Sequence, residues 1–151
     1  MRAPGCKKHK HPALRSPISE AAFMREFHRI YDRAVYGAIF RGRRPELATV
    51  EDIKLSRSLG REHERNARRY GATVMMDEGV IFEFAPQILW LPKRNRRGVI
   101  AHEIGHALLY HKSNHSEDEA DQAAYWALGG LTINYDLRWP GKGLQTANNV
   151  D

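Results

Sequence analysis

Apolar positions near the amino terminus follow helical spacing and predict an amphipathic helix from Ser19 to about Ile39. Ser19 is placed to cap this helix, with Glu20 in its first turn. Gly42 and Pro45 follow its end. The predicted apolar face consists of Phe23, Phe27, Ile30, Tyr31, Ala34 and Val35.

A second helix is predicted from Thr49 to about Gly71. Glu51 and Asp52 would lie favourably against its amino-terminal dipole. Its apolar positions are Val50, Ile53, Leu55 and Leu59, after which the segment becomes strongly basic.

The periodicity changes after residue 71, where short β-prone runs predict a small antiparallel sheet. Residues 72–76 and 80–84 flank Asp77-Glu78-Gly79, which favours a hairpin turn. A third apolar run closes at Pro92, and a proline at a strand end suits the edge of a sheet. This predicted edge strand consists of Ile88, Leu89, Trp90 and Leu91.

Two helices are predicted after the sheet. Asn95 can cap the first, which carries His102 and His106 along the margin of its apolar face. The second runs from Glu117 to about Leu128 and stops at two glycines. The order of helix, helix, small sheet, helix, helix predicts an α+β fold.

The composition agrees with one globular domain. The chain has 151 residues, of which 42% are hydrophobic and 28% charged. We expect a basic disordered tail over 1–17, a single domain over 18–140 and a loose tail over 141–151. Cys6 is the only cysteine, and neither a signal-peptide core nor a membrane-spanning apolar run is found. These features predict a cytoplasmic protein without a membrane partner.

The formal net charge of +6 raises the question of a nucleic-acid partner. No helix-turn-helix, zinc-finger or aromatic stacking pattern accompanies the basic residues, so solvated surfaces are the favoured interpretation. Weak nucleic-acid contact or an acidic protein partner is the alternative. The basic residues form a tail cluster (Arg2, Lys7, Lys8, Lys10, Arg15), a helical stripe (Arg57, Arg61, Arg65, Arg68) joined by Arg69, and a third group (Lys93, Arg94, Arg96, Arg97).

The sequence His102-Glu103-Ile104-Gly105-His106 indicates metal chemistry. Two histidines four residues apart on a helix can bind one zinc ion, and Glu103 is then placed to take a proton from an activated water. Composition alone produces this pattern in about 3% of shuffled chains, so the surrounding residues must decide.

A zinc hydrolase needs a third protein ligand. The metzincin signature is excluded, because its glycine and third histidine are Leu109 and Lys112 here. Glu117 is the favoured third ligand, and Asp121, one turn later, could accept the other imidazole N–H of a ligating histidine. Glu119 is the competing ligand, and His111 and His115 are further candidates.

Residues 97–109 (RGVIAHEIGHALL) and 117–124 (EDEADQAA) together resemble the ImmA/IrrE-like metallopeptidases. These are compact gluzincins with the pattern A-H-E-x-G-H, a short gap and E-x-x-A-[D/N]. The resemblance covers residues 70–128, although the aromatic-Ala pair that often follows the Asp/Asn is replaced by residues 122–126 (QAAYW). It implies a minimal zincin-like domain and a zinc-dependent endopeptidase acting on a protein, such as a repressor or other DNA-binding regulator.

The implied mechanism is zinc peptide hydrolysis with Glu103 as the base. Substrate would lie extended beside the predicted edge strand over residues 88–91. An oxyanion-stabilising side chain is expected among Tyr110, Tyr125, Tyr135, His111 and His115.

Two other functions stay open at this point. One is a catalytically silent zinc-binding sensor or partner-docking module. The other is a basic nucleic-acid-associated protein in which the metal is structural, which predicts affinity falling steeply with salt.

Overall fold

The computed structural model describes residues 13–40, 49–67, 69–110, 112 and 114–128. Residues 1–12 of the predicted tail 1–17, and all of the predicted tail 141–151, lie outside them. Over this part the chain forms an α+β fold, as predicted, with four α-helices, a 3₁₀ helix and a three-stranded mixed sheet. The elements are α1 (Glu20–Phe40), β1 (Thr49–Leu55), α2 (Arg57–Arg65), β2 (Gly71–Met76), β3 (Gly79–Phe84), η2 (Pro86–Trp90), α3 (Lys93–Leu108) and α4 (Glu117–Ala127).

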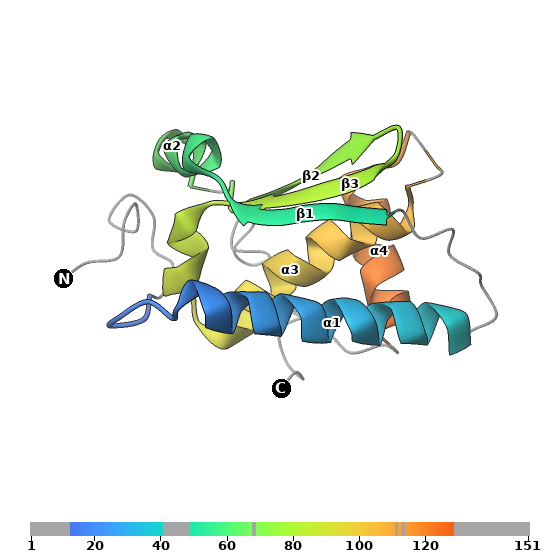
Figure 1. The fold of residues 1–151 in the computed structure, drawn as a ribbon, viewed down its shortest axis with the longest axis horizontal. Helices are drawn as coiled ribbons and strands as arrows, with labels where there is room; N and C mark the ends of the chain where they lie inside the picture. Colours follow the sequence, from blue (N-terminus) through green and yellow to red (C-terminus); the bar gives the residue numbers. More distant parts are fainter. Residues whose placement is uncertain (1–12, 41–48, 68, 111, 113, 129–151) are drawn as a thin grey trace.

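Helix α1 forms as its apolar spacing predicts and covers one face of the sheet together with α3 (Figure 1). The Ser19 hydroxyl accepts a hydrogen bond from the Ala22 amide at 3.0 Å, so the predicted cap is confirmed. Phe27 is fully buried and packs on Phe82 of the central strand, with ring centroids 5.0 Å apart. This aromatic contact joins α1 to the sheet.

The predicted second helix is wrong in its first half, because residues 49–55 form strand β1. Val50 and Ile53 are β-branched, and their partly buried side chains pack against the core. The helix begins only at Arg57, where the Ser56 hydroxyl accepts from the Leu59 amide at 3.2 Å. The apolar residues of this segment therefore serve two elements instead of one helix face.

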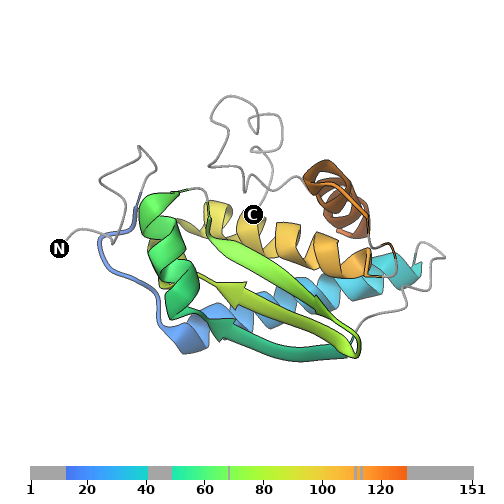
Figure 2. The same ribbon diagram turned by 90° about the horizontal axis from the view of Figure 1, so that it is seen from above.

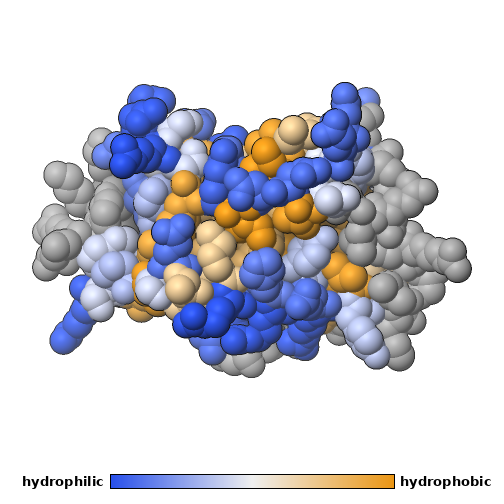
Figure 3. Space-filling model, viewed as in Figure 1, coloured by the Kyte–Doolittle hydropathy of each residue, from blue (hydrophilic) through white to orange (hydrophobic). Residues whose placement is uncertain are grey.

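The sheet has the order β1-β3-β2. Strands β2 and β3 are antiparallel and joined by the predicted turn, whereas β1 runs parallel to β3. The sheet is therefore mixed, and the expectation of a purely antiparallel sheet is wrong. Apolar side chains reach the surface between β1 and α1, while hydrophilic residues cover α2 (Figure 3).

The predicted edge strand over residues 88–91 is also wrong: residues 86–90 form the 3₁₀ helix η2. Pro86 lies at its start, and Ile88 and Leu91 are fully buried. A short, largely buried apolar run does not distinguish a strand from a helical turn. These residues belong to the core and offer no strand edge to a substrate.

Helix α3 runs through the interior and is buried over most of its length. A buried ion pair holds its beginning against α1, with Arg96 Nε 2.6 Å from Glu26 Oε1. Arg96 also donates to the Leu91 carbonyl at 2.7 Å. The interpretation of this basic group as solvated surface is thus wrong for Arg96, which is 6% exposed.

Helix α4 packs beside the carboxyl-terminal half of α3 (Figure 2). In the described ranges, no helix combines the length and the apolar character needed to cross a bilayer.

Candidate metal centre

Three potential metal ligands meet between α3 and α4. The Nε2 atoms of His102 and His106 lie 3.2 Å apart, because residues four apart share one helix face. His102 Nε2 is 3.0 Å from one carboxylate oxygen of Glu117, and His106 Nε2 is 3.1 Å from the other. Ligand atoms bound tetrahedrally to one zinc ion lie about 3.3 Å apart, so this spacing suits a divalent metal. The His-His-Glu group could therefore hold a metal ion.

The close approach of the two helices depends on Gly105. A Cβ atom at this position would lie 2.0 Å from the main-chain oxygen of Ala120. Ala120 itself is fully buried. The two small residues therefore let the backbone of α4 touch α3, which places Glu117 opposite both histidines.

Glu119 has a different role from Glu117. It forms a capping box with Ser116: its side chain accepts from the Ser116 amide at 3.0 Å, and its amide donates to the Ser116 hydroxyl at 3.1 Å. Its carboxylate also pairs with Lys112. Glu119 is thus committed to the start of α4, and the geometry favours Glu117 as the ligand.

Asp121 lies behind His102. Its Oδ1 is 2.6 Å from His102 Nδ1, so the imidazole Nε2 faces the other two donors. Burial opposes protonation of His102, but hydrogen bonds with Asp121 and Glu117 raise its pKa to about 9. Hydrogen bonds from His102 and His106 hold the pKa of Glu117 well below its usual range.

His115 lies behind the second histidine, His106. The distance between His106 Nδ1 and His115 Nε2 is 2.8 Å, and His115 Nδ1 is 2.7 Å from the Lys112 carbonyl. His115 thus contacts the edge of the His106 ring that faces away from Glu117. His111, the other histidine considered as a ligand, lies outside the described residues.

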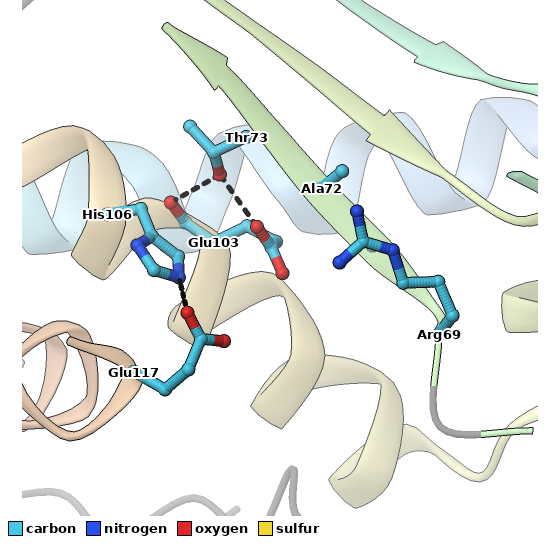
Figure 4. Close-up of a pocket in the computed structure, with 7 residues that line it drawn as sticks. Arg69, Ala72, Thr73, Glu103, His106 and Glu117 are labelled. Atoms are coloured by element: carbon cyan, nitrogen blue, oxygen red, sulfur yellow. Dashed lines mark hydrogen bonds and ion pairs between the residues drawn. The ribbon is translucent and has the colours of Figure 1, made fainter. Parts of the chain in front are cut away.

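Glu103 is buried beside the three donors and is held by Thr73 of strand β2. Thr73 Oγ1 lies 2.7 Å from Glu103 Oε1 and 3.0 Å from the Glu103 main-chain oxygen (Figure 4). Gly71 makes room for this carboxylate, because a Cβ there would lie 3.0 Å from Glu103 Cγ. The sequence predicts residues 72–76 only as a β-prone run, which neither marks Thr73 as a site residue nor reveals which strand face meets α3.

Glu103, His106 and Glu117 line an open pocket of about 160 Å³. Strand β2 forms one wall and the two helices the other (Figure 4). Arg69 reaches into the pocket from the side opposite His106 and Glu117 (Figure 4). It forms an ion pair with Glu62, with 3.9 Å between Arg69 Nε and Glu62 Oε1. The lining residues are Arg69, Gly71, Ala72, Thr73, Glu103, His106 and Glu117.

The residues considered for oxyanion stabilisation do not line this pocket where they are described. The Tyr110 hydroxyl donates to the Met76 carbonyl, Tyr125 is half exposed on α4, and His115 is behind His106. Tyr135 lies outside the described residues. Arg69 is the cationic side chain among the lining residues.

Comparisons with models of protein families, with curated proteins and with solved structures found no match to this chain. Two imidazoles and one carboxylate form a donor set typical of catalytic zinc sites with an open coordination position.

Proposed function

We propose that this protein is a zinc-dependent endopeptidase of the compact gluzincin type, similar to the ImmA/IrrE-like metallopeptidases. One observation carries the proposal: a second carboxylate, Glu103, lines the same pocket as His106 and Glu117 and is held by a hydrogen bond from Thr73. A purely structural metal site needs no such carboxylate. A hydrolytic site needs one as its base.

His102, His106 and Glu117 would hold the ion. Bound zinc supplies Lewis-acid activation of a water molecule and of the scissile carbonyl. Glu103 accepts the proton from the attacking water and later returns it to the departing amine. Thr73 donates a hydrogen bond to one oxygen of Glu103 and leaves the other oxygen, Oε2, available for this transfer.

Substrate binding is best assigned to β2. This strand pairs with β3 alone among the described strands, and it contributes Gly71, Ala72 and Thr73 to the pocket wall. An extended peptide can add to such an edge through main-chain hydrogen bonds, which brings its carbonyl groups past the site. The positive charge of Arg69 favours peptides that present a carboxylate nearby.

The biological substrate is a protein, and the resemblance favours a repressor or other DNA-binding regulator. The alternative is a silent metal-binding module with the same donors. The peptidase and the silent module would both bind metal. Only peptide hydrolysis requires proton transfer by Glu103.

The variant Glu103→Gln separates these alternatives. It removes the base but keeps the size of the side chain, so metal content should be unchanged while peptide cleavage falls about 10²- to 10⁴-fold. Comparing proteins cleaved in the native host carrying wild type or this variant provides the activity and the substrate together. The matched control is Glu119→Gln, which keeps the capping box and should cleave normally.

Cleavage that persists in Glu103→Gln with the metal still bound would mean that this site is not the hydrolytic centre. Wild-type protein that binds no zinc by metal analysis would refute the metal centre itself.

A further inference from the structure

The second metal-binding histidine of this site is supported by another histidine. We infer that His115 is a positioning residue of the metal centre, which fixes the proton and the ring direction of His106 through a hydrogen bond. The inference rests on the proposed metal site but not on peptidase activity.

The hydrogen-bond partners determine which ring nitrogens carry protons. The Lys112 carbonyl only accepts, so His115 Nδ1, 2.7 Å away, must be the donor. In a neutral His115 the Nε2 atom is then an acceptor. It lies 2.8 Å from His106 Nδ1, which must therefore donate. A metal ion between His106 and Glu117 would then bind the lone pair of His106 Nε2, in place of the present 3.1 Å contact of this atom with the Glu117 carboxylate.

The chain Lys112–His115–His106 thus selects the tautomer of His106 that can bind a metal. Asp121 does the same for His102 at 2.6 Å. The two ligands therefore have different supports, one a carboxylate and the other an imidazole. Among the described residues, the carboxylate partner of His106 lies at Nε2, and its Nδ1 contacts an imidazole.

The position of His115 is itself fixed by the start of α4. It directly precedes Ser116, whose hydroxyl caps the helix through the Glu119 amide. Lys112 is tied to the same helix through Glu119. Both ends of the hydrogen-bonded chain are therefore anchored, which gives the connection between α3 and α4 a role in ligand orientation.

A direct ligand role does not fit this geometry. His115 Nε2 faces the Nδ1 edge of His106, whereas the donors converge at His106 Nε2. Ligation by His115 would require breaking its contact with His106.

Four variants test the inference by zinc affinity, measured by competition with a chromophoric chelator. His115→Ala removes the support and should weaken zinc binding about 10- to 100-fold. His115→Gln places an amide oxygen near the Nε2 position and should restore most of the affinity. His115→Asn, whose shorter amide reaches only the Nδ1 position, should resemble alanine. His28→Ala changes an exposed histidine of α1 and should leave affinity unchanged.

Absorption spectra of the cobalt-substituted proteins provide a second readout. We expect His115→Ala to keep a spectrum with all three ligands, only distorted, in contrast to His106→Ala. Equal zinc affinity in wild type and His115→Ala, or equal affinity in the Gln and Asn variants, would overturn the inference. Loss of a ligand in the His115→Ala spectrum would make His115 a ligand and overturn it too. If the alanine variant fails to fold, the Gln and Asn pair still decides.

These outcomes are separable from failure of the proposed function. A protein that binds zinc but cleaves nothing would contradict the peptidase proposal and leave the His115 test intact.

Discussion

At the scale of single residues, the direction of the Glu103 carboxylate depends on one hydroxyl group. Thr73 and Glu103 are on different elements, and the 2.7 Å hydrogen bond between them joins β2 to α3. A hydrogen bond to a charged group contributes about 1.5–3 kcal/mol. The proposed base is therefore oriented by the same strand that we assign to substrate binding.

Replacing Thr73 by Val should lower kcat/KM about tenfold or more, because Glu103 loses the donor that directs it. Zinc content should stay unchanged, since the Thr73 hydroxyl is hydrogen-bonded to Glu103 and not to a proposed metal ligand within the described residues. Steady-state kinetics with metal analysis checks both. The control Thr73→Ser keeps the hydroxyl and should recover most of the activity, and full activity in Thr73→Val would contradict this role.

The residues of the site differ in how visible they are in the sequence. The spacing of one helix predicts His102, Glu103 and His106, and the acidic residues of the next helix predict Glu117 and Asp121. Thr73 is thirty positions away from Glu103 in sequence, and only the packing of β2 on α3 brings them together. A contact of that kind has no local pattern.

At the scale of elements, the pairing of α3 and α4 depends on the missing side chain of Gly105. Its Cβ would collide with main-chain atoms of Ala120, which cannot rotate away. The backbone contact therefore determines how closely α4 packs on α3 and where the Glu117 carboxylate lies.

Gly105→Ala should destabilise the protein by about 1–3 kcal/mol or more, since overpacking exceeds the gain of about 1 kcal/mol in helix propensity. Zinc affinity should fall as well, because α4 carries Glu117 away from the histidines. Chemical unfolding and zinc competition measure the two effects. Stability at or above that of wild type would show that the gain in helix propensity exceeds the cost of overpacking. It would also mean that the helices are not in backbone contact.

The two errors in the predicted elements share one cause. The segment 49–55 has acidic residues at positions that would favour the start of a helix. It nevertheless forms a strand, because it pairs with residues 79–84 of β3. Residues 88–91 are apolar throughout, which fits any fully buried segment. In both cases a distant partner decides between conformations that local sequence leaves nearly equal.

At the scale of the whole molecule, protons and a metal ion would compete for the same site. Without metal, hydrogen bonds with Asp121 and Glu117 raise the pKa of His102 to about 9, although burial opposes this. Protonated His102 therefore stabilises the folded metal-free protein. This stabilisation is complete below pH 6.5, the pKa of His102 in the unfolded chain, and is lost as the pH rises through about 9, its pKa in the folded protein. Glu117, with its lowered pKa, stays anionic over this range.

Zinc affinity should therefore rise with pH up to about 9, because His102 must release its proton to bind the ion. At pH 7 we expect about one proton released per zinc bound. Calorimetric titrations in buffers of different ionisation enthalpy measure this number. Zinc binding without proton release at pH 7 would contradict the raised pKa.

All three donors lie on α3 and α4, within residues 102–117, and none comes from α1 or the sheet among the described residues. Bound metal thus holds together one helical hairpin and not the entire fold. Chelation should speed amide hydrogen exchange in α4 and leave the central strand β3 protected, whereas uniform acceleration would indicate global opening. Metal supply would then control a local, reversible release of one helix, so that the protein remains folded while its pocket is dismantled.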